Sequence, residues 1–214
     1  MGEYRELHRE LEDAVVEEVF RHGFCGATVA GICRRGGVGT EFFHRHYADL
    51  EDGYCETLEA LRDRMLADMR YAFAVESGWR DRMRGASWAM ADFLEADRRR
   101  PKFMGVESLN AGERSRAIVE GLVEAIVELV DQGRYELDDP DRLTRATAEA
   151  TVGGVFNTLR VAMSHGRHRA AELTPQLMFT VVQPYFGSEA ALTELELTRV
   201  EPLVGEDRPR VLSA

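Results

Sequence analysis

The histidine pairs are the side chains whose type and spacing could hold a metal ion. His44 and His46 are separated by one residue, and His165 and His168 by two. Residues two apart on a helix point about 200° away from each other, so His44 and His46 cannot easily share an ion. His165 and His168 flank a glycine where a helix is expected to end, and solvated histidines are ordinary there. We therefore expect no metal site.

The motifs of common enzyme classes are absent from the sequence. It contains no GxSxG, HExxH or phosphate-binding P-loop, and no GxGxxG run that follows a strand. Cys25, Cys33 and Cys55 are an odd number without CxxC spacing, which argues against a disulfide framework. We expect no catalytic residues, no cofactor and no enzyme activity.

The stretch from Val29 to Asp52 has a pattern typical of DNA binding. Thr28 is a good N-cap for a short helix, and Gly36-Gly37 ends that helix. A second short helix follows at once, and at least one of the two glycines is expected to need a positive φ. Two short helices joined by a tight glycine turn form a helix-turn-helix, whose second helix can lie in the DNA major groove.

The second of these helices is expected to present polar side chains outward. Val38 and Phe42 would point back to a small core, which leaves Thr40, Glu41, His44 and Arg45 free to meet base edges or phosphates. Between residues 20 and 47 there are four arginines and one acid, a local charge of +3. This segment therefore carries the candidate nucleic-acid contacts.

The composition fits a globular protein that does not coat nucleic acid. The chain has 214 residues, 44% of them hydrophobic, and a formal net charge of −11. Phosphate binding needs a local excess of basic residues, so only the local patch can serve it. No apolar run reaches the roughly 18 residues of a membrane span, and no secretory leader is recognisable. We expect a cytoplasmic protein without a membrane partner.

Helical periodicity continues along the whole chain, and no segment shows the alternation of a strand. Further helices are expected to begin at Asp49, near Trp79, at residue 113, at Asp139-Pro140 and at Thr174-Pro175, with a break at Pro101. The fold class is therefore all-α. We expect an N-terminal three-helix helix-turn-helix domain at 1–48, a larger helical ligand-binding and dimerisation domain at 49–199, and a loose tail at 200–214.

The larger domain offers material for a pocket wall. Aromatic and thioether side chains suit an apolar or aromatic ligand, although each could equally be ordinary core. Polar groups in apolar helical segments could orient such a ligand, or be satisfied by a neighbouring helix. The candidate ligand-binding residues are Phe73, Met83, Met90, Phe93, Phe103 and Met104, with the polar residues Glu107, Asn157 and Arg160.

A family resemblance covers nearly the whole chain. The run from Ala14 through Phe20, Gly23, Thr28-Val29, Ile32, Gly37-Val38, Phe42-Phe43 and His46-Tyr47 to Glu51 resembles the N-terminal domain of the tetracycline-repressor (TetR) family. Later residues resemble its effector domain more loosely: Trp79 with Arg84, Val106-Glu107 before Ala111-Gly112, Gly153-Gly154, and Pro184-Tyr185-Phe186-Gly187. The resemblance implies an all-helical homodimer that represses transcription on palindromic operator duplex DNA and is released by a small-molecule effector.

The resemblance also assigns roles to residues. The DNA-binding set is Thr28, Arg34, Arg35, Gly39, Thr40, Glu41, Phe43, His44, Arg45 and Tyr47. The dimer interface is placed on two apolar stripes, Val152, Gly153, Phe156 and Leu159 in one helix and Leu177, Met178, Val181 and Val182 in another. The helix that begins at Asp49 becomes the lever between the pocket and the DNA, with its part from Met65 to Phe73 beside the pocket.

Three departures from the family pattern weaken the expected grip on DNA. Gly39 stands where the family usually has serine, Phe43 where it has tyrosine, and Leu50 where it has lysine or arginine. Each change removes a phosphate contact, and together they lower affinity by tens to hundreds of fold on the usual scale of about 1 kcal/mol per hydrogen bond. The alternative function is therefore a TetR-like ligand- or partner-binding dimer whose helix-turn-helix no longer binds DNA specifically.

Overall fold

The computed structural model describes residues 2–164 and 169–197, and that part of the chain is built from helices without a strand. The predicted all-α fold class is confirmed. The helices, joined by short turns and 3₁₀ segments, are α1 (Gly2–His22), α2 (Val29–Arg35), α3 (Thr40–His46), α4 (Leu50–Val75), α5 (Trp79–Glu95), α6 (Arg100–Gly105), α7 (Glu113–Asp131), α8 (Arg145–Ser164) and α9 (Ala170–Glu196). His165, His168 and the expected tail at 200–214 lie outside the described residues.

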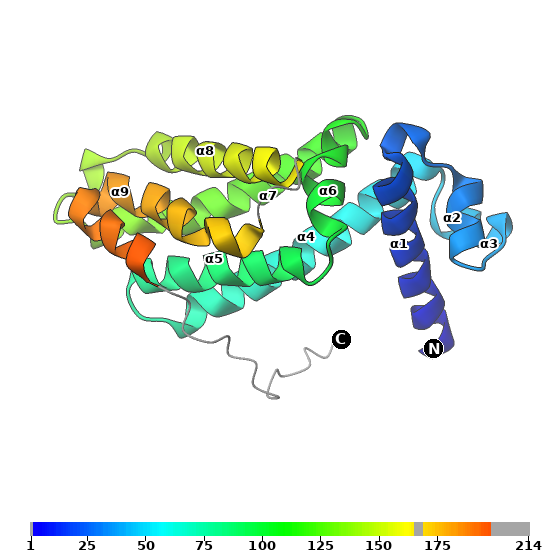
Figure 1. The fold of residues 1–214 in the computed structure, drawn as a ribbon, viewed down its shortest axis with the longest axis horizontal. Coiled ribbons are helices and arrows are strands. Elements are labelled where there is room, and N and C mark those ends of the chain that lie inside the picture. Colours follow the sequence, from blue (N-terminus) through cyan, green and yellow to red (C-terminus); the bar gives the residue numbers. More distant parts are fainter. Residues whose placement is uncertain (1, 165–168, 198–214) are drawn as a thin grey trace.

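Figure 1 shows α1, α2 and α3 at one end of an elongated molecule and α5, α7, α8 and α9 as a bundle at the other. The long helix α4 begins beside α3 and continues along the bundle, so the two ends share one continuous helix. The short helix α6 lies between the bundle and α1, with which it is in contact.

The capping residues read from the sequence act as predicted. The Thr28 hydroxyl accepts a hydrogen bond from the Gly31 N–H at 3.0 Å, and the Asp49 carboxylate accepts one from the Asp52 N–H at 2.9 Å. These bonds satisfy N–H groups that a helix leaves without partners in its first turn. Gly37 has a φ of 62°, so the predicted turn between α2 and α3 does use a backbone conformation that favours glycine.

Two helix starts differ from the sequence expectation. Pro140 begins only a short 3₁₀ turn, Pro140–Arg142, and α8 starts at Arg145. The helix expected from Thr174-Pro175 starts earlier, because the Glu172 carboxylate accepts a hydrogen bond from the Arg169 N–H at 3.3 Å and caps the chain there. Pro175 therefore lies inside α9. A capping bond formed by neighbouring residues decided this start, and the proline did not.

The end of the bundle far from α1 is organised around Trp79, the first residue of α5. Its indole N–H donates to the Leu129 carbonyl oxygen at 2.9 Å, and its ring stacks on Phe186 at 5.8 Å between centroids. Gly133 lies against this ring so closely that a Cβ atom there would be 2.6 Å from the indole. The tryptophan therefore requires a residue without a side chain at position 133.

We expect Gly133→Ala to destabilise the protein by about 1–3 kcal/mol, since overpacking a buried ring forces side chains or backbone to move. Gly121→Ala is the matched control, because a Cβ at Gly121 of α7 meets no atom within 4 Å. The control should be stabilised by about 1 kcal/mol through helix propensity. Urea unfolding followed by circular dichroism measures both changes, and equal stabilities of the two variants would contradict the packing described.

Candidate nucleic-acid interface and ligand pocket

The helix α3 is fixed in place by two buried aromatic residues, Phe43 and Tyr47. Their exposed fractions are 0% and 3%, and both rings pack on Gly53 of α4. A Cβ at Gly53 would lie 3.1 Å from the Tyr47 ring and 3.3 Å from the Phe43 ring. Burial also raises the pKa of Tyr47 to about 12. The assignment of Phe43 and Tyr47 to DNA contact is therefore wrong in this structure, because both rings are needed to anchor α3.

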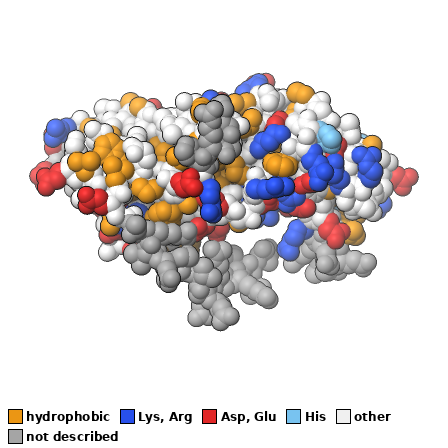
Figure 2. All heavy atoms as spheres, in the orientation of Figure 1, with side chains coloured by type: hydrophobic (Ala, Val, Ile, Leu, Met, Phe, Trp, Pro, Cys, Tyr) orange, Lys and Arg blue, Asp and Glu red, His pale blue; other side chains and the backbone are white. Residues whose placement is uncertain are grey.

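The opposite face of α3 is open to solvent. Thr40, Glu41, His44 and Arg45 are all exposed, as the helical spacing predicts, and Val38 and Phe42 pack against the core. The Arg45 guanidinium lies 5.8 Å from the centroid of the Phe42 ring. Gly39 is the N-cap of α3 and provides no side-chain hydrogen bond. In Figure 2, Lys and Arg side chains gather over the half of the molecule that carries α1–α3.

The Arg35 side chain of α2 is bound to a buried carboxylate of the same chain and is not free to bind a DNA phosphate. Its Nε donates to the Glu18 carboxylate at 2.6 Å, and Glu18 of α1 is only 3% exposed. Burial is the largest single effect and raises the pKa of Glu18, but the hydrogen bond and charge of Arg35, the nearby His22 and a backbone hydrogen bond from Thr28 together hold the pKa below its ordinary value. Gly31 makes room for the same carboxylate. Thr28 is likewise used as a helix cap, which leaves Arg34 as the exposed cation of α2.

An apolar pocket lies inside the bundle between α4 and α9. Six of the eight methionines in the chain line it, and its polar lining consists of Ser87 and Arg160. Thioether side chains are flexible and polarisable, so such a wall can adapt to apolar ligands of different shape. The lining residues are Met65, Met69, Met83, Ser87, Met90, Leu94, Pro101, Met104, Gly105, Leu122, Val123, Ile126, Val130, Val152, Val155, Phe156, Leu159, Arg160, Met163, Leu177 and Val181.

Four of the nine expected ligand-binding residues line this pocket: Met83, Met90, Met104 and Arg160. The other five do not. Phe73 and Phe93 lie under the guanidinium groups of Arg82 and Arg100, and Phe103 packs on Tyr54. Asn157 is on the exposed side of α8, and Glu107 is bound to Phe24 in the turn after α1. Met65 and Met69 were not in the ligand-binding set, although they lie in the Met65–Phe73 part of the helix that the resemblance places beside the pocket. Met163 was missed altogether.

The expected dimer residues mostly face the inside of the chain. Val152, Phe156, Leu159, Leu177 and Val181 line the pocket, and Met178 and Val182 are buried in the core. Gly153 alone of the eight is exposed. These stripes are therefore not available as an interface, apart from Gly153. An apolar helical stripe looks the same in sequence whether it packs against its own chain or another copy.

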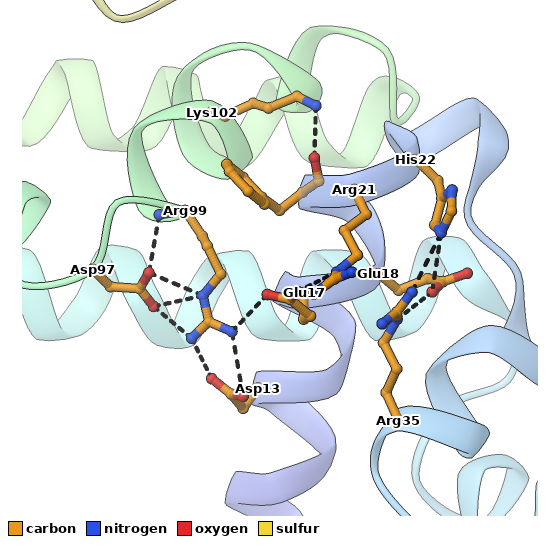
Figure 3. A network of polar contacts seen from close by, with 10 residues as sticks. Asp13, Glu17, Glu18, Arg21, His22, Arg35, Asp97, Arg99 and Lys102 are labelled. Atoms are coloured by element: carbon orange, nitrogen blue, oxygen red, sulfur yellow. Dashed lines mark hydrogen bonds and ion pairs between the residues drawn. The ribbon is translucent and has the colours of Figure 1, made fainter. Parts of the chain in front are cut away.

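Polar contacts join the pocket wall to α1, as Figure 3 shows. Arg99, at the start of α6, forms ion pairs with Asp13 and Glu17 of α1 and with Asp97. The Lys102 ammonium donates to the Phe20 carbonyl oxygen at 2.8 Å. The same short helix places Pro101, Met104 and Gly105 in the pocket wall. One face of α6 thus lines the pocket, while Arg99 and Lys102 join the same helix to α1.

The buried carboxylate of Glu107 completes this connection. It is 6% exposed, accepts a hydrogen bond from the Phe24 N–H at 2.9 Å, and lies 3.6 Å from the Lys102 ammonium. Phe24 belongs to the turn that leads from α1 to α2. The segment that follows α6 is therefore bonded to the backbone of the helix-turn-helix region, 83 residues away in sequence.

No helix within the described residues is long and apolar enough to cross a membrane. Among the same residues, no group of His, Cys, Asp or Glu side chains is arranged to hold a metal ion. His44 is exposed, and its Nδ1 is within 3.2 Å of the Ala48 carbonyl oxygen, while His46 Nδ1 is 2.9 Å from the Phe42 carbonyl oxygen. The two rings therefore make separate local contacts.

Comparisons with known proteins identify the fold. No protein-family model and no curated protein sequence matches the chain. The fatty acid degradation regulator FadR from Bacillus halodurans matches in structure with a TM-score of 0.73 at 14% identity, over 81% of this chain and 97% of that one. FadR from Bacillus subtilis, in complex with stearoyl-CoA, matches with a TM-score of 0.71 at the same identity and coverage.

A third structural match comes from Syntrophomonas wolfei, a protein described as a TetR-family transcriptional regulator. Its TM-score is 0.71 at 11% identity, over 86% of this chain and 97% of that one. All three matches cover at least 81% of this chain and 97% of the matched one. The chain therefore has the fold of the TetR-family transcriptional regulators.

Proposed function

We propose that this protein is a ligand-responsive transcriptional regulator that binds operator DNA through α3 and is released by a small apolar molecule. The observation that carries the proposal is the division of α3 into two faces. Phe43 and Tyr47 are buried and fix the helix, while Thr40, Glu41, His44 and Arg45 remain exposed. A firmly seated helix with an open polar face is what major-groove reading requires.

The charges on α3 favour contact with bases as well as with phosphates. A Glu41 carboxylate would be repelled by phosphate, whereas it can accept a hydrogen bond from the amino group of cytosine. Arg45 lies one turn further on the same face and can reach guanine or phosphate. In a two-fold dimer two such helices would fit half-sites roughly 34 to 36 Å apart, one turn of B-DNA.

The pocket indicates the class of effector. Its wall is almost entirely apolar, and its methionines can accommodate a flexible chain. The structurally similar FadR of Bacillus subtilis is described in complex with stearoyl-CoA, a molecule with a long apolar chain. A ligand in this pocket would touch α4 through Met65 and Met69, and α6 through Met104. Both helices also contact α1, so two routes lead from the effector to the DNA-binding end.

A second candidate function is a TetR-like ligand-binding dimer without specific DNA binding. It is favoured by the ion pair of Arg35 with Glu18, which removes one cation from the DNA-binding set, and by the N-cap Gly39, which has no side-chain oxygen. Salt dependence separates the two functions, because each phosphate contact contributes about one unit to the slope of log affinity against log salt.

We expect Arg45→Ala to weaken binding to the promoter region of the protein's own gene about tenfold or more, the usual value of one good base contact. Arg70→Ala is the matched control, since Arg70 is exposed on the part of α4 that runs along the bundle. Mobility shifts at low and physiological salt measure both. If folded wild-type protein gives no specific shift at either salt, the regulator proposal fails and the second candidate is favoured.

The bonds between Glu107 and the turn after α1 should hold the DNA-binding end against the bundle. Glu107→Ala leaves the Phe24 N–H and the Lys102 ammonium without their carboxylate, at a cost of about 1–3 kcal/mol. We expect faster amide hydrogen exchange in residues 20–26 and slight change in the pocket helices. Glu128→Ala, at an exposed position of α7, is the control. Unchanged exchange in residues 20–26 would show that this bond does not restrain the DNA-binding end.

The proposed homodimer would use the outward faces of α8 and α9. Gly153, Gly154, Asn157 and Val161 are exposed along α8, and a Cβ added to either glycine meets no atom within 4 Å in the single chain. Small residues let two helices approach closely, and a second copy would explain why they stand here despite their cost of about 1 kcal/mol each in helix propensity.

We expect wild-type protein to be a dimer at micromolar concentration and Gly153→Leu to be a folded monomer. The single chain has room for the leucine, so loss of the dimer should occur without loss of thermal stability. Analytical ultracentrifugation and thermal unfolding measure the two properties. A monomeric wild-type protein would rule out this interface, and so would a Gly153→Leu variant that remains fully dimeric.

A further inference from the structure

The internal pocket has a neighbouring groove on the surface between α7 and α8. The groove is lined by Leu109, Arg116, Val119, Glu120, Val123, Glu124, Val127, Glu149 and Phe156. Val123 and Phe156 also line the internal pocket. These two side chains border both spaces, so we take them as the partition between the pocket and the groove.

Arg160 stands one helical turn after Phe156 on α8, at the pocket side of this partition. It is the one charged side chain that lines the pocket within the described residues. Its guanidinium donates to the amide oxygen of Asn157 at 2.9 Å, and no carboxylate of the described residues pairs with it. A guanidinium can hold a carboxylate through two parallel hydrogen bonds, so Arg160 still has that capacity.

The groove beyond the partition has the opposite charge. Glu120, Glu124 and Glu149 line it against the single cation Arg116. Arg145 forms ion pairs with Glu124 and Glu149. The three glutamates and the two arginines together carry a net charge of −1. A small carboxylate at Arg160 would remain on the pocket side, whereas a larger head with several negative charges would extend into a groove that repels it.

We propose that the effector is a long-chain carboxylic acid whose chain occupies the methionine-lined pocket, whose carboxylate binds Arg160, and which enters between Val123 and Phe156. This inference rests on the proposed function and specifies its effector. Because the head is a single carboxylate, the free acid should bind more tightly than its coenzyme A thioester. Phe156 should control the rate of entry and exit, since it borders both spaces.

Displacement of the neutral dye Nile red by matched fourteen-carbon compounds tests the assignment of Arg160. Arg160→Gln should raise the Kd of tetradecanoate at least tenfold and leave that of tetradecanol within twofold, because the alcohol needs only the apolar wall. Arg142→Gln, a matched change at an exposed arginine outside the pocket, should alter neither. Equal weakening of acid and alcohol, or no weakening of the acid, would overturn the assignment.

The charge of the groove is tested by tetradecanoyl-CoA. Wild-type protein should bind it at least tenfold more weakly than tetradecanoate, and Glu120→Gln should reduce this difference several fold. Glu128→Gln, the same change on α7 outside the groove, should not. Tighter binding of the thioester than of the acid would overturn the proposal of a single carboxylate head.

The entry route is tested by stopped-flow binding. Phe156→Trp should slow association of tetradecanoate at least fivefold, and Phe156→Ala should speed its dissociation, while equal rates in all variants would place the entrance elsewhere. Mobility shifts without ligand keep this proposal separate from the proposed function. If the protein binds DNA specifically but the acid does not displace Nile red, only the proposed effector is contradicted. If the acid binds through Arg160 but no DNA shift is seen, only the proposed regulator function is contradicted.

Discussion

The packing of α4 is the constraint on which the rest of the structure depends. Its first turns carry Gly53, on which the rings of Phe43 and Tyr47 seat α3. Further along, Met65 and Met69 line the pocket. A single helix of 26 residues therefore packs against α3 at one end and lines the pocket further along. In the proposed regulator, a ligand that tilts α4 at the pocket would also shift the seat of α3.

A second connection between the pocket and α1 runs through α6. Arg99 and Lys102 bind α1 while Met104 lines the pocket, so α6 cannot move without stretching ionic contacts to α1. These contacts are partly exposed, and each is worth little by itself. In the proposed regulator, a hundredfold release of DNA would require about 2.7 kcal/mol of coupling, and several such contacts together with a shift of α4 would supply it.

The pocket combines an adaptable wall with one fixed charge. Methionine side chains change rotamer at little cost in free energy, so the wall would select a ligand by the length of its apolar part more than by its shape. Arg160 would provide the polar selectivity of the proposed ligand site, because a charged group at an apolar wall favours a ligand that pairs with it. Five other lining residues were expected at the dimer interface, because a helix that lines a pocket is as apolar as one that lines an interface: Val152, Phe156, Leu159, Leu177 and Val181.

The sequence by itself determined the local features, whose structure depends on residues close together in the chain. The all-α fold, the bounds of α2, the start of α7, the caps at Thr28 and Asp49, the positive φ at Gly37 and the exposed face of α3 all follow from contacts within a few residues. The methionine content of the pocket was visible in part for the same reason, as Met83, Met90 and Met104 recur on apolar helical faces.

Only the tertiary structure decided the roles that depend on a distant partner. Arg35 reads as a phosphate ligand until Glu18 of α1 is seen beside it, and Phe43 reads as a DNA contact until it is found against Gly53. The inward face of Val152 and Leu159 and the bond of Glu107 to Phe24 also join segments far apart in the chain. Helical periodicity shows that a side chain will be buried, but its partner is fixed by how the helices pack, which local sequence does not encode.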